Sequence, residues 1–295
     1  MLAYLAPSQA EPARIIGITG TPGAGKSSLV GELAQRLIRL RADARVGVLA
    51  IDPSSQISGG ALLGDRTRVR FAVDEPRLYF RSQASDLDLG GLGRHSYAVA
   101  RLMRQLFDFV FVETVGIGQS EIDIRYLADR SYLVMQPLGG DQVQFMKAGI
   151  MEIPDAFILN KCDEGEVAQR SYHMLRASLG LARPLDAGAE GERLTIHRTS
   201  AITGQGLDAL VAEIAATARA MERAAEREHY FFRKWVRDSY GLSGLRALQQ
   251  GEFDAAQAQL DFEGAVAAFG PYYRDWLHRQ GGAELLGSST LGNWR

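Results

Sequence analysis

The chain has 295 residues, of which 46% are apolar and 23% charged, and its 33 basic and 35 acidic residues give a net charge of −2. This balance excludes nucleic-acid binding through a strongly basic surface, and the length allows one large domain or two smaller ones. The chain has a single cysteine, it has no apolar run of the ~18 residues that a membrane span needs, and it shows no signal-peptide pattern. We therefore expect a cytoplasmic protein without a membrane or nucleic-acid partner.

Short apolar runs alternate with helical segments over the first 216 residues. Because these runs are continuous rather than alternating, they favour strands of a parallel sheet that is covered on both faces. We expect buried strands at residues 14–19, 45–51, 78–81, 109–112, 131–136 and 156–159, and a late strand at 194–197. We expect helices at residues 27–40, 94–106, 142–150, 167–179 and 207–216. The alternation predicts a doubly wound, mostly parallel α/β domain over residues 1–216.

Residues 217–295 are predicted to form a helical extension. We expect one long charged helix at 217–240 with aromatic residues at its end, and a pair of helices over 252–279 broken at Gly270 and Pro271. The aromatic residues Tyr230, Phe231, Phe232 and Trp235 can pack back on the chain's own core. Alternatively, the extension is an arm that binds a second subunit or another partner.

A phosphate-binding motif occupies residues 20–27, GTPGAGKS, between a predicted strand and a predicted helix. That context is the one that G-x-x-x-x-G-K-[ST] requires, and it identifies a P-loop NTPase fold. Backbone N–H groups of such a loop surround phosphate oxygens, the lysine reaches the β- and γ-phosphates, and the serine hydroxyl ligates Mg²⁺. The predicted phosphate contacts are Gly20, Gly23, Ala24, Gly25, Lys26, Ser27 and Ser28.

A second motif, N-K-x-D, indicates which base is bound. Asn160, Lys161 and Asp163 follow an apolar strand directly, at the edge where open α/β sheets bind ligands. Asp163 can accept hydrogen bonds from the ring N–H and the exocyclic amine of guanine, a paired contact that adenine cannot make. Lys161 can lie along the base plane, and Asn160 can tie this loop to the phosphate loop.

A short Thr-Ser-Ala segment follows the late strand and can complete the base site. We expect Ser200 there, and the backbone N–H of Ala201 can meet the guanine carbonyl oxygen. Cys162, at the variable position of N-K-x-D, is interpreted as a small filler rather than a redox or metal-binding group.

Three acidic residues could complete a Mg²⁺ site, because this ion prefers hard oxygen ligands and keeps several waters. Asp52 and Glu113 end predicted strands beside the phosphate loop, and Asp65 lies in a loop where it could sense the nucleotide or could instead cap a helix. Gly116 offers an N–H to the γ-phosphate, so the segment 114–120 should shift when that phosphate leaves.

Hydrolysis of the nucleotide needs charge neutralisation and an oriented water. Beside Lys26, the candidates for placing that water are Asp65, Glu113 and Gln119. Arg66 and Arg68 could add positive charge. We expect slow turnover by the protein alone.

With these motifs, the sequence resembles the GTPase chaperones of cobalamin-dependent acyl-CoA mutases, the MeaB/ArgK type. The resemblance rests on GITGTPGAGKSS, DPSS, SGGALLGDRTR, ETVGIGQSE, GDQVQFMKAG and NKCD, at residues 17–28, 52–55, 58–68, 113–121, 140–149 and 160–163. The run ETVGIGQSE, which replaces the D-x-x-G of common GTPases, is the most discriminating piece.

The resemblance implies a homodimeric GTPase that uses GTP, GDP and Mg²⁺ to gate cobalamin loading or repair in a partner mutase. It assigns Lys26 and Ser27 to phosphate and Mg²⁺, and Asp52, Asp65 and Glu113 to the metal and water region. It also implies a third mobile switch at residues 138–147. The chain departs from the family in a short segment before the first strand, and in Gln142 and Ala148, where charged residues are common.

Two other functions remain open from the residues. A P-loop kinase of a small molecule or transport protein would use the same phosphate loop, although N-K-x-D argues for guanine. A metal-insertion GTPase would need clustered ligands, whereas Cys162 is alone and the five histidines lack ligand spacing.

Overall fold

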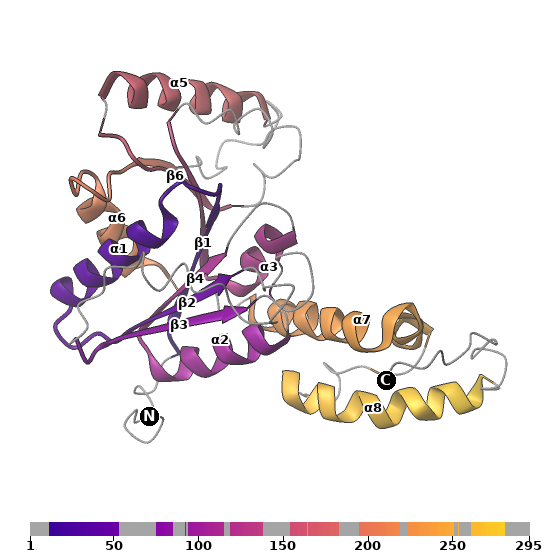
Figure 1. Cartoon of the computed structure of the whole chain (residues 1–295). Helices are drawn as coiled ribbons and strands as arrows, with labels where there is room; N and C mark the ends of the chain where they lie inside the picture. The colour runs from indigo at the N-terminus through magenta and orange to yellow at the C-terminus, as the bar shows by residue number, and fades with distance from the viewer. Residues whose placement is uncertain are drawn as a thin grey trace, which may run out of the picture. The chain divides into compact units, whose positions relative to one another are not determined.

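The structure is a computed structural model that describes residues 12–52, 75–84, 92, 94–114, 119–137, 154–163, 165–182, 195–218, 223–250, 253 and 261–280. The chain divides into two compact units, Met1–Ala220 and Met221–Arg295. The first unit contains the sheet and the second contains two long helices (Figure 1).

A parallel sheet forms the centre of the first unit. Its strands are β1 Arg14–Gly20, β2 Val46–Asp52, β3 Leu78–Ala84, β4 Phe109–Thr114, β5 Arg130–Met135, β6 Ala156–Leu159 and β7 Thr195–Arg198. Their order across the sheet is β3-β2-β4-β1-β5-β6-β7, and every pair of neighbours is parallel. The predicted doubly wound parallel α/β fold is therefore confirmed, and the loops after all strands emerge at one edge of the sheet.

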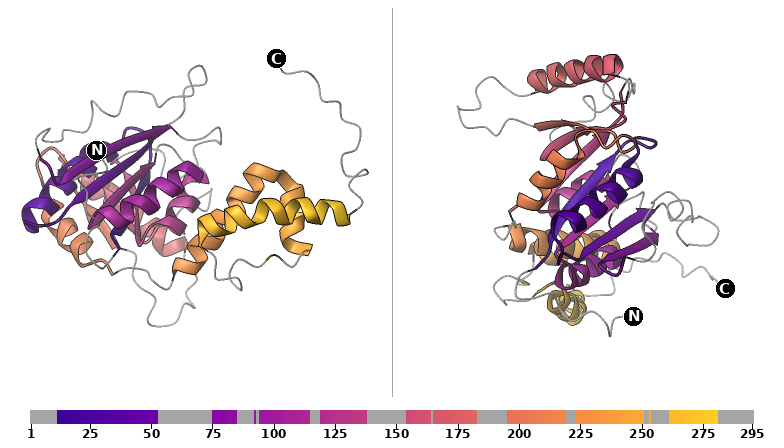
Figure 2. Two further views of the ribbon diagram at one scale, coloured as in Figure 1. Left: turned by 90° about the horizontal axis from the view of Figure 1, so that it is seen from below. Right: turned by 90° about the vertical axis from the view of Figure 1, so that its left-hand side faces the viewer.

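Helices cover both faces of this sheet. In the first unit they are α1 Lys26–Leu40, α2 Arg94–Leu106, α3 Gln119–Leu127, α5 Gly165–Ala182 and α6 Leu207–Ala216. One buried cluster joins α1 and α6 to residues of alternate register on β1, β2, β4, β5 and β6, and a second joins α5 to the opposite face of β5 and β6 (Figures 1 and 2). None of the described helices is both long and apolar enough to cross a membrane.

The two edge strands differ from the expectation of burial on both faces. The residues of β7 are exposed or half-buried throughout, and β3 is likewise only partly covered. An edge strand has a neighbour on one side only, so its apolar residues are covered less than those of β1 or β4. The position of a strand in the sheet, at the edge or in the centre, cannot be predicted from the residues of that strand alone.

The helical boundaries of the extension also require correction. The helix that we expected to begin at Thr217 begins at Ala224 instead, as α7 Ala224–Gln250, because Thr217 ends α6. The N–H of Thr217 donates to Ile214 O at 3.1 Å, and the Thr217 hydroxyl donates to Glu213 O at 3.2 Å. α7 then continues past residue 240 after a kink at Gly241, whose φ of 62° lies in the left-handed region.

The predicted break at Gly270 and Pro271 is wrong, because α8 Phe262–Arg279 runs through both residues. Phe269, fully buried, packs edge-on against Phe232 of α7 with ring centroids 5.7 Å apart. Such packing on α7 outweighs the hydrogen bond that proline removes from the helix. The aromatic residues of α7 thus pack within their own unit. The predicted helix at 142–150 lies outside the described residues, as does the part of the predicted pair before residue 261 apart from Phe253.

A polar cluster joins α6 to the sheet through Glu213. Its carboxylate accepts Arg130 Nη2 at 2.8 Å and the Tyr132 hydroxyl at 3.0 Å, and it lies 3.1 Å from His197 Nε2. Burial lowers the pKa of His197 below its ordinary value; the carboxylate of Glu213 acts in the opposite direction and only partly offsets this, while Arg130 adds to the lowering. The folded protein therefore favours neutral His197.

We predict that His197 makes the fold sensitive to mild acid. The unfolded chain takes up the proton near pH 6.5, while the folded chain resists it, so the free energy of unfolding falls as pH drops through that value. His197→Gln cannot titrate, so it should lose less stability than wild type between pH 7.5 and 5.5 in urea unfolding. The same substitution at exposed His173 controls for loss of a histidine. Equal pH profiles for wild type and His197→Gln would contradict the prediction.

Candidate functional site

The phosphate loop lies between β1 and α1, as predicted. Gly20, Gly23 and Gly25 all have positive φ values, of 138°, 79° and 82°, and α1 begins immediately after them at Lys26. These left-handed positions turn successive backbone amides toward the inside of the loop, beside the N-terminus of a helix. The arrangement is suited to binding an anion.

Lys26 spans this loop from within. Its ammonium donates to Gly20 O at 2.8 Å and to Thr21 O at 3.0 Å, and the residue is only 6% exposed. The side chain is thereby held against the loop, with its charge where phosphate oxygens would lie. Ser28 is exposed in the first turn of α1.

The hydroxyl of Ser27 and the carboxylate of Glu113 meet at the foot of the loop. Ser27 Oγ donates to Glu113 Oε1 at 2.7 Å, and Glu113 is buried near the end of β4, opposite Ile18 of β1. Two predicted metal ligands are therefore brought together although they are far apart in sequence. Their hard oxygens fit Mg²⁺, which needs only one or two such groups beside water and phosphate.

The remaining predicted groups of the metal and water region are only partly described. Asp52 ends β2, whose Ala50 pairs with Glu113 of β4, so Asp52 belongs to the same edge of the sheet, but its side chain is outside what the structure describes. Gln119 begins α3, and its side chain is not described either. Asp65, Gly116, Arg66, Arg68 and the segment 138–147 lie outside the described residues.

The N-K-x-D segment, residues 160–163, which we call the base loop, follows β6 and touches the phosphate loop. Asn160 is 1% exposed, and its Nδ2 donates to Ala24 O at 2.9 Å, as the sequence led us to expect. A Cβ on Gly25 would lie only 2.8 Å from the same Nδ2, so only glycine allows the two loops to approach this closely.

Residues 199–206, which we call the rim loop, hold the base loop from the other side. Asn160 Oδ1 accepts the Thr199 hydroxyl at 3.2 Å and the N–H of Ala201 at 3.3 Å. The Ala201 N–H, which we expected to meet a guanine carbonyl, thus makes a long bond to Asn160 in this structure. Thr199 was not among our predicted site residues, although its position directly after β7 and before Ser-Ala marks it.

Asp163 is oriented by the rim loop and exposed to solvent. The Ser200 hydroxyl donates to Asp163 Oδ1, while the buried Ser200 accepts the N–H groups of Ile202 and Thr203 at 3.2 and 3.0 Å. Lys161 is also exposed, with the left-handed φ of 63°, and its Nζ reaches Gln136 Oε1 at 3.1 Å. The carboxylate is held at the surface, available to paired donors of a planar ring.

Cys162, between these two exposed residues, points inward. It is 3% exposed, its thiol lies 3.1 Å from Leu159 O, and its N–H donates to Thr199 O at 2.9 Å. Burial raises the pKa of the thiol above its ordinary value. The geometry agrees with the interpretation of a small filler, and among the described residues no group of three or more His, Cys, Asp or Glu could hold a metal ion.

Comparison with known proteins gives one family. A family model described as methylmalonyl-CoA mutase-associated GTPase MeaB matches residues 1–239. A protein of Pyrococcus horikoshii that carries the name GTPase is 42% identical over 67% of this chain and 62% of its own. A mitochondrial protein of Caenorhabditis elegans named methylmalonic aciduria type A homolog is 38% identical over 53% of this chain and 39% of its own.

A solved structure titled LAO/AO transport system kinase has the same fold. It superposes with a TM-score of 0.54 and 22% identity, over 89% of this chain and 82% of that chain. Identity this low supports the fold alone. The chain spans less than two thirds of the length of the two curated relatives described above, 62% and 39%.

We predict that Asn160 stabilises the site by joining the loops. Asn160→Ala leaves the buried Ala24 carbonyl and Thr199 hydroxyl without this partner, so the free energy of unfolding should fall by about 1–3 kcal/mol. Lys161→Met is a matched control next in sequence, where loss of an exposed contact should cost less than about 0.5 kcal/mol. Chemical denaturation of both variants measures the difference; equal stabilities would show that the loop contact contributes nothing.

Proposed function

The chain belongs to the MeaB family of methylmalonyl-CoA mutase-associated GTPases, and on this basis we propose that it binds GTP with Mg²⁺, hydrolyses it to GDP and phosphate, and acts as a chaperone for a cobalamin-dependent acyl-CoA mutase. In this proposal it gates cobalamin loading or repair, and it works as a homodimer. A cytoplasmic location stays a prediction from the sequence.

One contact supports the nucleotide part of the proposal most strongly. The Asn160 side chain bonds to the backbone of the phosphate loop, so a base held by Asp163 and a triphosphate held around Lys26 are kept at a fixed separation. A guanine ring offers Asp163 two N–H donors in one plane, and an adenine ring offers no such pair. The site therefore favours GTP over ATP.

The hydrolytic step is assigned to groups at the phosphate end. Ser27 and Glu113 would hold Mg²⁺, and the ion would supply positive charge to neutralise the phosphates. Lys26 contributes positive charge from within the loop, where its contacts to two backbone carbonyls already hold it. Glu113, Gln119 and Asp65 are the candidates for orienting the attacking water, and Asp52 and Gly116 complete the proposed metal and γ-phosphate contacts.

The partner follows from the family and from the name of one relative. The family is described as mutase-associated, and the Caenorhabditis elegans relative is named for methylmalonic aciduria. We propose that the client is an acyl-CoA mutase and that the second unit, with α7 and α8, serves dimerisation or client binding. A P-loop kinase, the name carried by a protein of the same fold, is the alternative from another class.

We predict that Asp163 decides base selectivity. Wild type should bind GDP far more tightly than ADP, and Asp163→Asn should lose about 10- to 100-fold in GDP affinity, because two charge-assisted hydrogen bonds are weakened. The same variant should gain affinity for xanthosine diphosphate, whose C2 carbonyl accepts from the new amide. Isothermal titration measures all three ligands. Equal affinities of wild type for GDP and ADP would end the guanine assignment.

We predict that a purified acyl-CoA mutase co-elutes with the chain and raises its GTP hydrolysis rate at least about tenfold, since a bound partner can order the groups around the phosphates. Phosphate release measures the rate. Lys26→Ala, which lacks the ammonium of the phosphate loop, is the control and should show no stimulation. Transfer of radiolabelled phosphate to an acceptor instead of its release as free phosphate would favour the kinase alternative.

A further inference from the structure

We propose that Arg36, on the outer side of α1, is a positioning residue for base recognition: it supports the rim loop so that Asp163 stays aimed at the guanine ring. The inference rests on the proposed function, because it names a residue that tunes selectivity at the same site. Arg36 does not touch the base itself; it acts through the rim loop.

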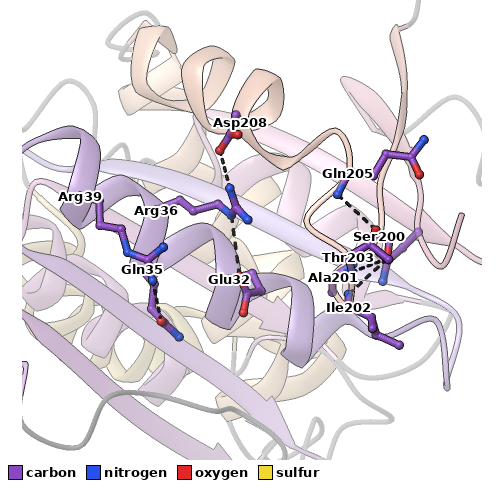
Figure 3. A network of polar contacts seen from close by, with 11 residues as sticks. Glu32, Gln35, Arg36, Arg39, Ser200, Ala201, Ile202, Thr203, Gln205 and Asp208 are labelled. Atoms are coloured by element: carbon purple, nitrogen blue, oxygen red, sulfur yellow. Dashed lines mark hydrogen bonds and ion pairs between the residues drawn. The ribbon is translucent and has the colours of Figure 1, made fainter. Parts of the chain in front are cut away.

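The rim loop is a tight turn that carries the orientation of Asp163. The N–H of Ser200 donates to Gln205 O at 3.0 Å, and the N–H of Gly204 donates to Ser200 O at 2.9 Å. Within this turn the Ser200 hydroxyl accepts the N–H groups of Ile202 and Thr203 (Figure 3). The same hydroxyl donates a hydrogen bond to Asp163 Oδ1. A shift of the turn therefore moves the group that orients the carboxylate.

The tip of this turn has little cover of its own. Ile202 is 87% exposed, although it is a large β-branched residue. The turn therefore depends on contacts made elsewhere along its length to keep its position. At its beginning the loop is held by Asn160, and near Gly204 it is held by the neighbouring helix α1.

Arg36 lies directly against the turn. A Cβ on Gly204 would fall 2.6 Å from Arg36 Nη2, so the guanidinium occupies the space beside this backbone, and the φ of +81° at Gly204 also favours glycine. Arg36 Nη1 donates to Asp208 Oδ1 in the first turn of α6, and Arg36 Nε lies 3.7 Å from Glu32 Oε2 one turn back on α1 (Figure 3). The side chain bridges α1, the rim loop and the start of α6.

This bridge connects the two ends of the nucleotide site. α1 starts at Lys26, in the phosphate loop, and carries Arg36 further along the same helix. A helix is stiff over this distance. The phosphate loop and the rim loop therefore both contact one rigid element, which limits how far they can move relative to each other. The planar guanidinium suits this role, since it offers several donors in a fixed plane while packing against backbone.

The expected effect is modest, because Asp208 is 86% exposed and ion pairs at a surface contribute little individually. The informative quantity is the preference for GDP over inosine diphosphate. Inosine diphosphate lacks the exocyclic amine whose N–H would donate a hydrogen bond to Asp163. A loss of protein stability alone would weaken the binding of both nucleotides equally. A change in the orientation of Asp163 would instead reduce the ratio of GDP affinity to inosine diphosphate affinity.

The experiment measures dissociation constants of GDP and inosine diphosphate by isothermal titration for wild type, Arg36→Met, Arg36→Lys and Arg39→Met. Arg39 is a matched control, because it is exposed on α1 one turn away, and among the described residues its Nη2 donates to Gln35 Oε1 of the same helix at 3.4 Å. We expect Arg36→Met to reduce the preference for GDP about threefold, Arg36→Lys to restore part of it, and Arg39→Met to retain it.

A double-mutant cycle with Asp208→Asn tests the route of the effect. If Arg36 acts through the start of α6, the double variant should lose less than the sum of the two single losses. An unchanged preference in Arg36→Met, whatever its thermal stability, overturns the inference and leaves the proposed function intact. Wild type that binds ADP as tightly as GDP would instead overturn the proposed function itself.

Discussion

A single buried hydrogen bond, from the Asn160 amide to the carbonyl of Ala24, sets the spacing on which the whole site depends. It joins a loop that follows β6 to a loop that follows β1, although β5 separates these strands in the sheet. Because all strands run parallel, both loops emerge at the same edge, and the bond only has to bridge one strand. The rest of the edge is arranged around this link: Ser27 meets Glu113 on one side of it, and the rim loop closes on the other.

The same edge separates two kinds of chemistry. The proposed phosphate contacts lie on the loop between β1 and α1 and on the end of β4, where backbone amides, an ammonium and hard oxygens lie close together. The proposed base contacts lie after β6 and β7, where the exposed Asp163 carboxylate accepts a hydrogen bond from the Ser200 hydroxyl. α1 contributes to both, since it begins in the phosphate loop and supports the rim loop with Arg36. Under the proposed function, one helix would therefore couple how tightly the phosphates are held to how selectively the base is bound.

Much of this arrangement could be predicted from the sequence because it is encoded locally. Continuous apolar runs located β1, β4 and β6 closely, and the two motifs located the phosphate and base loops. What could not be predicted depends on contacts between distant segments. The partial exposure of β7 follows from its place at the edge, α8 passes through Pro271 because Phe269 packs on α7, and Arg36 has no motif that distinguishes it from other surface arginines. The kink at Gly241 and the start of α7 at Ala224, rather than at residue 217, likewise depend on backbone geometry rather than on hydrophobic pattern.

The buried thiol inside the base loop has a practical consequence. Cys162 is the only cysteine of the chain, and both its side chain and its backbone N–H are turned toward the interior, beneath Lys161 and Asp163. An alkylating reagent needs this buried sulfur to become exposed, and movement of the base loop away from the rim loop would expose it. Under the proposed function, the rate of modification at this one atom would report how often the base loop opens during nucleotide exchange, without any engineered label.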